Sequence, residues 1–217
     1  TTLPGNVFAG TTSLEEVILP ESLEIIGGSA FAGCVNLKSI EIPDGVTEIR
    51  SGAFNGCTGL TSIDFPASLT VIGSRAFYGC TGLTSMNFQE GITKLDYEAF
   101  YGCTGLKEVT LPDSITYFGY NLFQNCTGLQ SINYPADLTE THSWADVFTG
   151  CSSLKSITVP EGVTTLCAYV FSGANYLEEV ILPESLKTIG GSALAGCVRL
   201  KSIEIPDGVT EIRSGAF

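Results

Sequence analysis

The chain has 217 residues, including 25 Gly, nine Pro and one Met, a composition that argues against a mainly helical fold and favours an all-β or solenoid protein. Ten Lys and Arg against 23 Asp and Glu give a net charge of −13, which disfavours nucleic acid or an anionic membrane as a partner. No apolar run approaches the roughly 18 residues that a membrane-spanning helix needs.

An internal repeat of 23 residues dominates the sequence. Three columns share this period, and one step of 25 residues between Phe123 and Phe148 interrupts it. The first column contains Pro, as at Pro43, in every copy except one, where Gln89 takes its place. The second column contains Phe8, Phe31, Phe54, Phe77, Phe100, Phe123, Phe148, Phe171, Leu194 and Phe217. The third follows the second by three residues and contains Cys34, Cys57, Cys80, Cys103, Cys126, Cys151 and Cys197.

Residues 37–59 illustrate the turn that this repeat predicts. Ile40 and Ile42 alternate with polar residues, which predicts a short strand whose copies pair as a parallel sheet. Residues 43–45 form a turn, residues 46–49 a second, shorter extended piece, and residues 53–57 one helical or 3₁₀ turn. The column of Gly56 holds Gly in eight copies and Asn125 in one, which indicates a positive φ.

A unit of this size cannot enclose its own apolar face, so burial must come from stacking turn upon turn. We therefore expect a solenoid, and residues 1–217 to form a single continuous array with eight complete repeats from Leu14 and partial repeats at both ends. Because both ends fall inside repeats without a polar cap, the chain is interpreted as a fragment of a longer protein. Residues 14–54 and 177–217 match at 37 of 41 positions, and the uncapped ends predict head-to-tail self-association.

The repeat resembles the BspA-like, or Treponema-type, leucine-rich repeats along the whole chain. The matching residues of one copy are Cys34, Leu37, Ile40, Ile42, Pro43, Val46, Ile49, Ala53, Phe54, Gly56 and Cys57. This resemblance implies a right-handed, curved solenoid with its parallel sheet on the concave side, about 23 residues per turn and little regular α-helix. It also implies a bacterial cell-surface or secreted adhesin for host matrix proteins or other cells. It identifies no ligand, because the shared residues are core positions.

Eight cysteines raise the question of disulfides or a metal site. The seven column cysteines would lie one turn apart, about 4.8 Å along the sheet direction, with parallel Cα–Cβ bonds that suit disulfides poorly. We expect them to be buried, reduced thiols, with no metal and no cofactor. Cys167 stands outside the column and is predicted to be free and partly exposed.

His142 and Trp144 lie in the longer turn. His142 has acidic neighbours but no nucleophile with a fixed orienting partner, so we expect no catalytic site and no enzyme. Trp144 either fills the core position that Ile49 takes in another turn or is an exposed binding aromatic.

Seven of the nine residues that follow the Pro column are acidic, as at Glu161. These carboxylates either suit the turn, which we favour, or attract Ca²⁺.

Two sets of residues are candidate binding surfaces. The first is an outward polar ladder on the predicted strands that would suit a basic protein surface and is otherwise a solvated sheet face: Glu41, Asp64, Asn87, Thr110 and Asn133. The second is a local group of aromatics that forms either an interface anchor or ordinary ring packing: Tyr78, Tyr97, Tyr101, Tyr117 and Tyr120.

These observations predict a non-enzymatic, extracellular or cell-surface recognition and adhesion module that binds a protein partner, such as a host matrix protein or another cell surface. The resemblance alone implies the extracellular location. The chain itself starts at Thr1 without a charged and apolar leader that would indicate it. The alternative is a passive spacer that holds another domain away from the cell wall.

Overall fold

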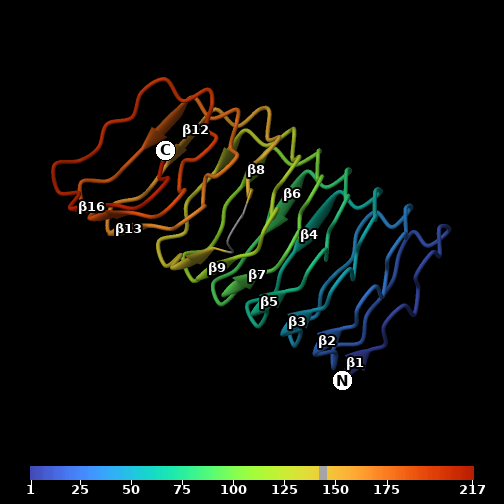
Figure 1. Cartoon of the computed structure of the whole chain (residues 1–217). Helices are drawn as coiled ribbons and strands as arrows, with labels where there is room; N and C mark the ends of the chain where they lie inside the picture. Colours follow the sequence, from blue (N-terminus) through green and yellow to red (C-terminus); the bar gives the residue numbers. More distant parts are fainter. Residues whose placement is uncertain (142–145) are drawn as a thin grey trace.

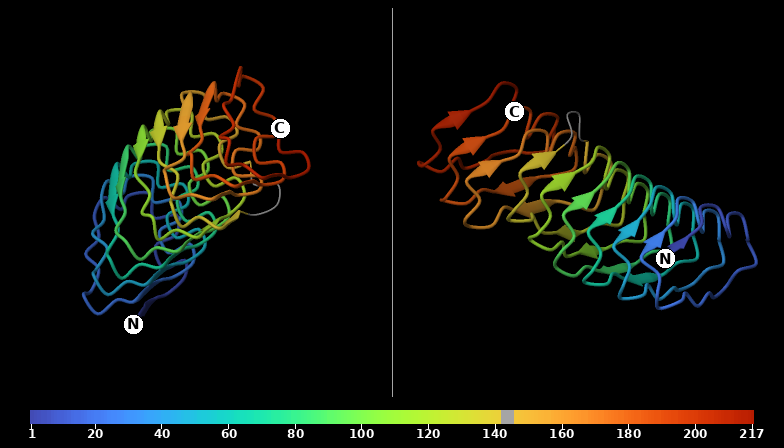
Figure 2. Two further views of the ribbon diagram at one scale, coloured as in Figure 1. Left: turned by 90° about the vertical axis from the view of Figure 1, so that its left-hand side faces the viewer. Right: turned by 90° about the horizontal axis from the view of Figure 1, so that it is seen from below.

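The computed structural model describes residues 1–141 and 146–217. The chain winds into a β-solenoid of about nine turns, each of about 23 residues, with the two termini at opposite ends of the array (Figure 1). The described residues contain short strands and turns but no helix. The predicted parallel solenoid is confirmed, and two rows of strands run along its length on different sides (Figure 2).

The longer row is a parallel sheet formed by the second extended piece of each turn. Its order is β1-β2-β3-β5-β7-β9-β11, and equivalent residues of successive turns are paired, as Ile26 with Ile49 and Ile49 with Ile72. Its strands are β1 (Thr2–Leu3), β2 (Ile25–Ile26), β3 (Glu48–Ile49), β5 (Val71–Ile72), β7 (Lys94–Leu95), β9 (Tyr117–Phe118) and β11 (Glu140–Thr141). A second sheet continues this row with β13 (Thr165–Leu166), β15 (Thr188–Ile189) and β16 (Glu211–Ile212).

The other row is formed by the first extended piece and consists only of two-stranded parallel sheets. The pairs are β4 (Ser62–Asp64) with β6 (Ser85–Asn87), β8 (Glu108–Val109) with β10 (Ser131–Ile132), and β12 (Ser156–Thr158) with β14 (Glu179–Ile181). We expected residues such as Ile40 and Ile42 to form the sheet, but these two residues lie outside any strand. The more continuous sheet is formed instead by the second extended piece, residues 46–49 and their equivalents, which we expected to be the shorter one.

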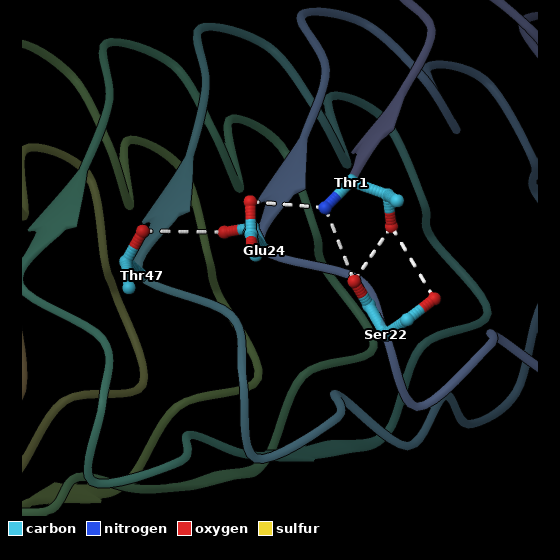
Figure 3. Close-up of polar contacts among 4 residues, drawn as sticks. All are labelled: Thr1, Ser22, Glu24 and Thr47. Carbon is cyan, nitrogen blue, oxygen red and sulfur yellow. Dashed lines mark hydrogen bonds and ion pairs between the residues drawn. The ribbon is translucent and has the colours of Figure 1, made fainter.

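A column of threonines reinforces the sheet that the second piece forms. The N–H of each threonine bonds to the carbonyl of the equivalent residue one turn earlier, as Thr93 does to Thr70, and its hydroxyl donates to the same carbonyl at 3.1–3.4 Å. This double contact begins with Thr47 on Glu24, whose carboxylate also lies 2.9 Å from the amino group of Thr1 (Figure 3). Side chains therefore reinforce the ladder beside β3, β5, β7, β9 and β11.

The core is a stack of phenylalanine rings, as predicted. From Phe8 to Phe123 successive ring centroids are 5.1–5.4 Å apart and the rings are nearly parallel. The rings of Phe31 to Phe123 are completely buried, so each contributes on the order of 1.5–3 kcal/mol of transfer free energy before chain entropy is subtracted. Burial therefore depends on neighbouring turns.

The stack loosens at the longer turn. The Phe123–Phe148 and Phe148–Phe171 centroids are 6.1 and 6.2 Å apart, and the second pair is tilted by 32°. In the described part of the chain β11 does not pair with β13, so the long row of strands divides at the same place. The two additional residues thus interrupt the regular contact between neighbouring turns.

Among the described residues two columns have positive φ in successive turns, and together they exclude a helix. The predicted column is confirmed by Gly56 at 71° and by Asn125 at 61°. A second column, four residues earlier, was not predicted and includes Arg75 at 56° and Glu98 at 54°. The expected helical or 3₁₀ turn at residues 53–57 is therefore wrong: Cys57 N bonds to Phe54 O, but Gly56 inside this turn has a positive φ that a right-handed helical turn excludes.

The column cysteines are all free thiols, and all but the half-buried Cys197 are buried. Each Sγ donates to the carbonyl of the preceding turn's phenylalanine at 3.1–3.2 Å, as Cys103 does to Phe77. They therefore act as hydrogen-bond donors as well as small apolar groups. Burial raises the pKa of Cys57 and Cys151 to about 12 and that of Cys197 to about 11.

The prediction that Cys167 is partly exposed is wrong, because its side chain is buried. Its Sγ donates to Leu138 O at 3.1 Å, and its backbone N–H donates to the hydroxyl of Tyr134 at 3.4 Å. Tyr134 occupies a buried strand position beside the longer turn, where its ring packs against Phe171. The altered packing beside that turn brings Cys167 inward.

Burial of the thiols predicts low reactivity. At pH 8 we expect Cys57 and Cys151 in the native protein to react with Ellman's reagent about 10³-fold more slowly than in guanidinium chloride, since the thiolate is the reacting species. Reaction rates of single-cysteine variants measure this, and equal rates in both states would contradict the buried arrangement.

The raised thiol pKa values also predict the pH dependence of stability. Their contribution is complete below the pKa of the unfolded thiol, about 8.5, and is lost as the pH rises towards the folded value. Between these limits we expect the free energy of unfolding to fall by about 1.4 kcal/mol per pH unit for each such thiol. Urea unfolding at pH 8 and pH 10.5 measures this, and Cys151→Ala should show a smaller difference than the parent chain.

Candidate functional site

One side of the solenoid, which carries the first extended piece of every turn, contains four grooves. We call it the groove side, and in Figure 1 it is marked by β4, β6, β8 and β12. Its N-terminal groove runs from residue 16 to Pro43, a second from Ser39 to Pro66, a central groove from Asp64 to Gln130, and a C-terminal groove from residue 178 to Pro206. Each groove is lined by residues of the first extended piece from at least two neighbouring turns.

The central groove is an open hollow of about 720 Å³ over β4, β6, β8 and β10. Phe88 provides apolar surface and the buried Met86 lies at the floor of the groove, while Lys107, Glu108 and Gln130 supply polar groups. A mixture of apolar and polar lining is typical of surfaces that contact another protein. Sequence reasoning did not identify the central groove, although Met86, the only Met of the chain, lies within it.

The five residues of the polar ladder are all exposed on the groove side. Asp64, Asn87 and Thr110 line the central groove, and Glu41 lines the groove beside it. Neighbouring members are tied to the structure: Asn87 Nδ2 donates to Asp64 Oδ1 at 2.5 Å. Asn133 accepts from the backbone N–H of Leu111 at 2.7 Å and donates to its carbonyl at 2.8 Å. These contacts hold the polar groups in fixed positions.

The tyrosine cluster, consisting of Tyr78, Tyr97, Tyr101, Tyr117 and Tyr120, is half-buried. Tyr78 stacks on Tyr101 and Tyr97 on Tyr120, both with ring centroids 4.7 Å apart. The Asn125 amide donates to the Tyr101 hydroxyl at 2.9 Å. Burial, together with hydrogen bonding to Tyr97, raises the pKa of Tyr117. Ring packing between turns thus accounts for part of the cluster, and hydroxyls and ring edges form its accessible part.

Cations border the tyrosine cluster. Arg75 Cζ lies 5.7 Å from the Tyr78 ring centre, and Lys94 Nζ lies 5.2 Å from that of Tyr117. Arg75 Nε also contacts the carboxylate of Glu98 at 2.5 Å. Glu98 is buried, and Asn121 Nδ2 donates to its other oxygen at 3.3 Å. Arg75 therefore joins a buried carboxylate to the exposed rim of the cluster.

The structure does not bring the two candidate surfaces together. Asp64 and Asn87 belong to β4 and β6 on the groove side, whereas Tyr117 belongs to β9 in the other row of strands (Figure 1). The proline turn at positions such as 43–45 separates the two rows within each turn. A single small ligand cannot contact both surfaces at once.

Acidic residues after the Pro column contact the backbone of the following turn. Glu161 accepts from the backbone N–H groups of Glu184 and Ser185 at 3.0 and 3.3 Å, and Asp113 accepts from that of Ala136 at 2.9 Å. These contacts support the turn interpretation. Within residues 1–141 and 146–217, no three His, Cys, Asp or Glu side chains are grouped so that they could hold a metal ion.

The sequence predictions for His142 and Trp144 lie outside the described residues. The register of β11 places Thr141 opposite Phe118, so Thr141 takes the position that Ile49 has in its own turn. The Thr141 hydroxyl donates to the carbonyl of Ala168, which joins the two sides of the interruption. Burial raises the pKa of Asp146.

The family model described as BspA type leucine-rich repeat region (6 copies) matches residues 1–130 and 93–217. A search of curated proteins returned no match. A solved structure of a leucine-rich cell surface protein from Faecalibacterium prausnitzii is 26% identical over 100% of this chain and 69% of that one, with a TM-score of 0.59.

Two further solved structures share the fold. The pneumococcal vaccine antigen PcpA is 24% identical over 98% of this chain and 63% of that one, with a TM-score of 0.56. A leucine-rich repeat protein from Eubacterium ventriosum is 21% identical over 100% of this chain and 79% of that one, with a TM-score of 0.59. Among the described residues there is no helix with the length and apolar character needed to cross a bilayer.

The Arg75–Glu98 contact predicts unequal effects of two arginine substitutions. Arg75→Met deprives a buried carboxylate of its cation and should lower the melting temperature. Arg50→Met removes a pair in which both side chains are more than one-third exposed, and it should have little effect. Thermal unfolding of both variants compares them, and an equal loss in the two would contradict a structural role for Glu98.

Proposed function

The chain belongs to the BspA-type leucine-rich repeat family, and from this premise we propose that it is an extracellular recognition module that binds a protein partner along its groove side. The alignment of four grooves on this one side carries the proposal. An extended surface built from successive turns is the usual binding surface of solenoid proteins. A host matrix protein or the surface of another cell is the proposed partner class.

The chemistry of the groove side favours a protein over other partners. Its polar ladder offers carboxylates, amides and hydroxyls at fixed positions, as at Asp64, Asn87 and Thr110. Phe88, which is half-buried, adds apolar surface in the central groove. The net charge of −13 favours a partner with a basic surface and speeds its association, because opposite charges attract over distance.

We propose the tyrosine cluster as a second contact surface for the same or another protein. Stacked rings lose little conformational freedom on binding, and Tyr is enriched among residues that dominate interface energies. Arg75 and Lys94 border the rings, and they are held there by ion pairs with Glu98 and Asp96. A partner that uses both surfaces would have to reach around the solenoid.

We propose that the chain is not an enzyme. The grooves are open and are lined by Ser, Thr, Asn, Asp and Glu side chains rather than by a nucleophile held against a base. The likeness to a leucine-rich cell surface protein supports a location outside the cell. The alternative, a passive spacer, requires only the stacked core and places no demand on outward residues.

An exchange of turns separates a binder from a spacer. Residues 60–128 are replaced by three copies of residues 37–59, which keeps the Phe, Cys and Pro positions but removes the central groove and the tyrosine cluster. We expect the parent chain to bind purified fibronectin, laminin or collagen in a surface plasmon resonance assay, and the exchanged chain to lose at least about tenfold in affinity, since interface anchors contribute 1–2 kcal/mol or more each.

A second variant assigns the surface that is used. The five tyrosines of the cluster are restored within the exchanged turns, and circular dichroism checks that both variants fold. Recovered binding would assign the contact to the tyrosine cluster, and continued loss would assign it to the central groove. Undiminished binding by the first variant, or no binding of any matrix protein by the parent chain, would contradict the proposal.

A further inference from the structure

An isoleucine interrupts the polar ladder at two places. Ile181, which has a neighbouring turn on each side, is 48% exposed, and Ile18 is exposed as well; both occupy the outward ladder position of their turns. The other residues of this position are polar: Glu41, Asp64, Asn87, Thr110, Asn133, Thr158 and Glu204. Thr110 and Thr158 are exposed there, so the position itself does not require an aliphatic side chain. The two isoleucines therefore call for an explanation outside the core.

Each isoleucine lies within a groove, and the two grooves are built from equivalent residues. The N-terminal groove is lined by Glu16, Val17, Ile18, Leu19, Glu21, Ser39, Ile40, Glu41 and Pro43. The C-terminal groove is lined by Glu179, Val180, Ile181, Leu182, Glu184, Ser202, Ile203, Glu204 and Pro206, together with Glu178 and Lys201. Every residue of the first groove thus recurs in the second, seven repeats further along the chain.

Three carboxylates surround each isoleucine. Glu16, Glu21 and Glu41 are exposed, and none takes part in an ion pair in the described part of the chain. The same holds for Glu179, Glu184 and Glu204. The two grooves differ in one cation: Lys38, beside the first groove, is paired with Glu15 at 3.4 Å, whereas Lys201 lines the second groove and takes part in no ion pair among the described residues. Carboxylates still outnumber this lysine in the second groove. An aliphatic side chain at the centre with negative charge around it is complementary to an apolar residue flanked by lysine or arginine.

We propose that the N-terminal and C-terminal grooves are two equivalent docking sites for an extended basic segment of a protein partner. An aliphatic side chain of the segment packs on Ile18 or Ile181, and basic residues two positions to either side reach the glutamates, because alternate residues of an extended chain share one face. The proposal adds the chemistry of the partner to the proposed function, but it depends on neither the central groove nor the tyrosine cluster.

The repeat fixes the distance between the two sites. Successive turns of a parallel solenoid advance by about 4.8 Å, so seven repeats separate the grooves by about 34 Å along the array. A partner with two basic segments at a compatible distance would bind both grooves at once. The second contact is then intramolecular, and the apparent affinity rises by about 10²–10⁴-fold without any new kind of contact.

Isothermal titration with a peptide of sequence KTVTK tests the proposal, since its lysines and valine lie on one face when it is extended. We expect two peptides to bind per parent chain. A bivalent form, with two such peptides joined by a Gly/Ser linker of about 40 residues that spans about 34 Å, should bind at least about 100-fold more tightly. The peptide ETVTE, with its charges reversed, should not bind.

Threonine substitutions provide matched variants, because threonine occurs naturally at this ladder position. Ile18→Thr and Ile181→Thr should each reduce the number of bound KTVTK peptides from two to one and abolish the gain of the bivalent peptide. Ser131→Thr, at an exposed position of β10 that lines none of the four grooves, should change neither. Fewer than two sites on the parent chain, equal binding of ETVTE, or two sites remaining after Ile18→Thr would each overturn the proposal.

The outcome is separable from that of the proposed function. The chain in which residues 60–128 are exchanged keeps both grooves and should still bind two KTVTK peptides. If this chain fails to bind matrix proteins but retains both peptide sites, the two-groove proposal stands on its own. If it binds matrix proteins while the parent chain shows no peptide site, only the two-groove proposal is overturned.

Discussion

The structure depends on one constraint: a single turn of 23 residues cannot bury its own apolar side chains. Phe54 is completely buried only because Phe31 lies on one side of its ring and Phe77 on the other, at 5.2 and 5.1 Å. Stability in such an array is the sum of what each turn and each interface between turns contributes. Outward residues contribute little to this stability, so they can vary to suit the surface of a partner.

Stacking also creates a problem of polar satisfaction, because turns with almost no regular structure expose many backbone carbonyl groups. The fold answers it with side chains that bond to the preceding turn. Cys103 donates to the carbonyl of Phe77 inside the core, and Thr93 donates to that of Thr70 at the surface. In the described residues no side-chain nitrogen or oxygen atom is buried without a hydrogen-bond partner. The repeated cysteine and threonine columns therefore serve the backbone as much as they serve packing.

The period of the sequence was sufficient to predict the solenoid, the stacked rings, the buried thiols and the positive φ at Gly56 and Asn125. It was not sufficient for features that depend on several turns at once. Arg75 and Glu98 have positive φ although neither residue type signals it, and the burial of Cys167 depends on how the chain accommodates the longer turn. The grooves form between turns, so no single repeat reveals them, and the tyrosines proved to be partly ring packing.

The interruption at the longer turn divides the array into two blocks. In residues 1–141 seven strands are paired in one sheet of the longer row, and in residues 146–217 three strands form another, with wider ring spacing between the two groups. In a chain of coupled units, the weakest neighbour contact is where cooperative melting is divided most easily. The array is therefore expected to divide at the longer turn when it is pulled from its two ends. One block would unfold and lengthen the molecule while the other block stayed folded.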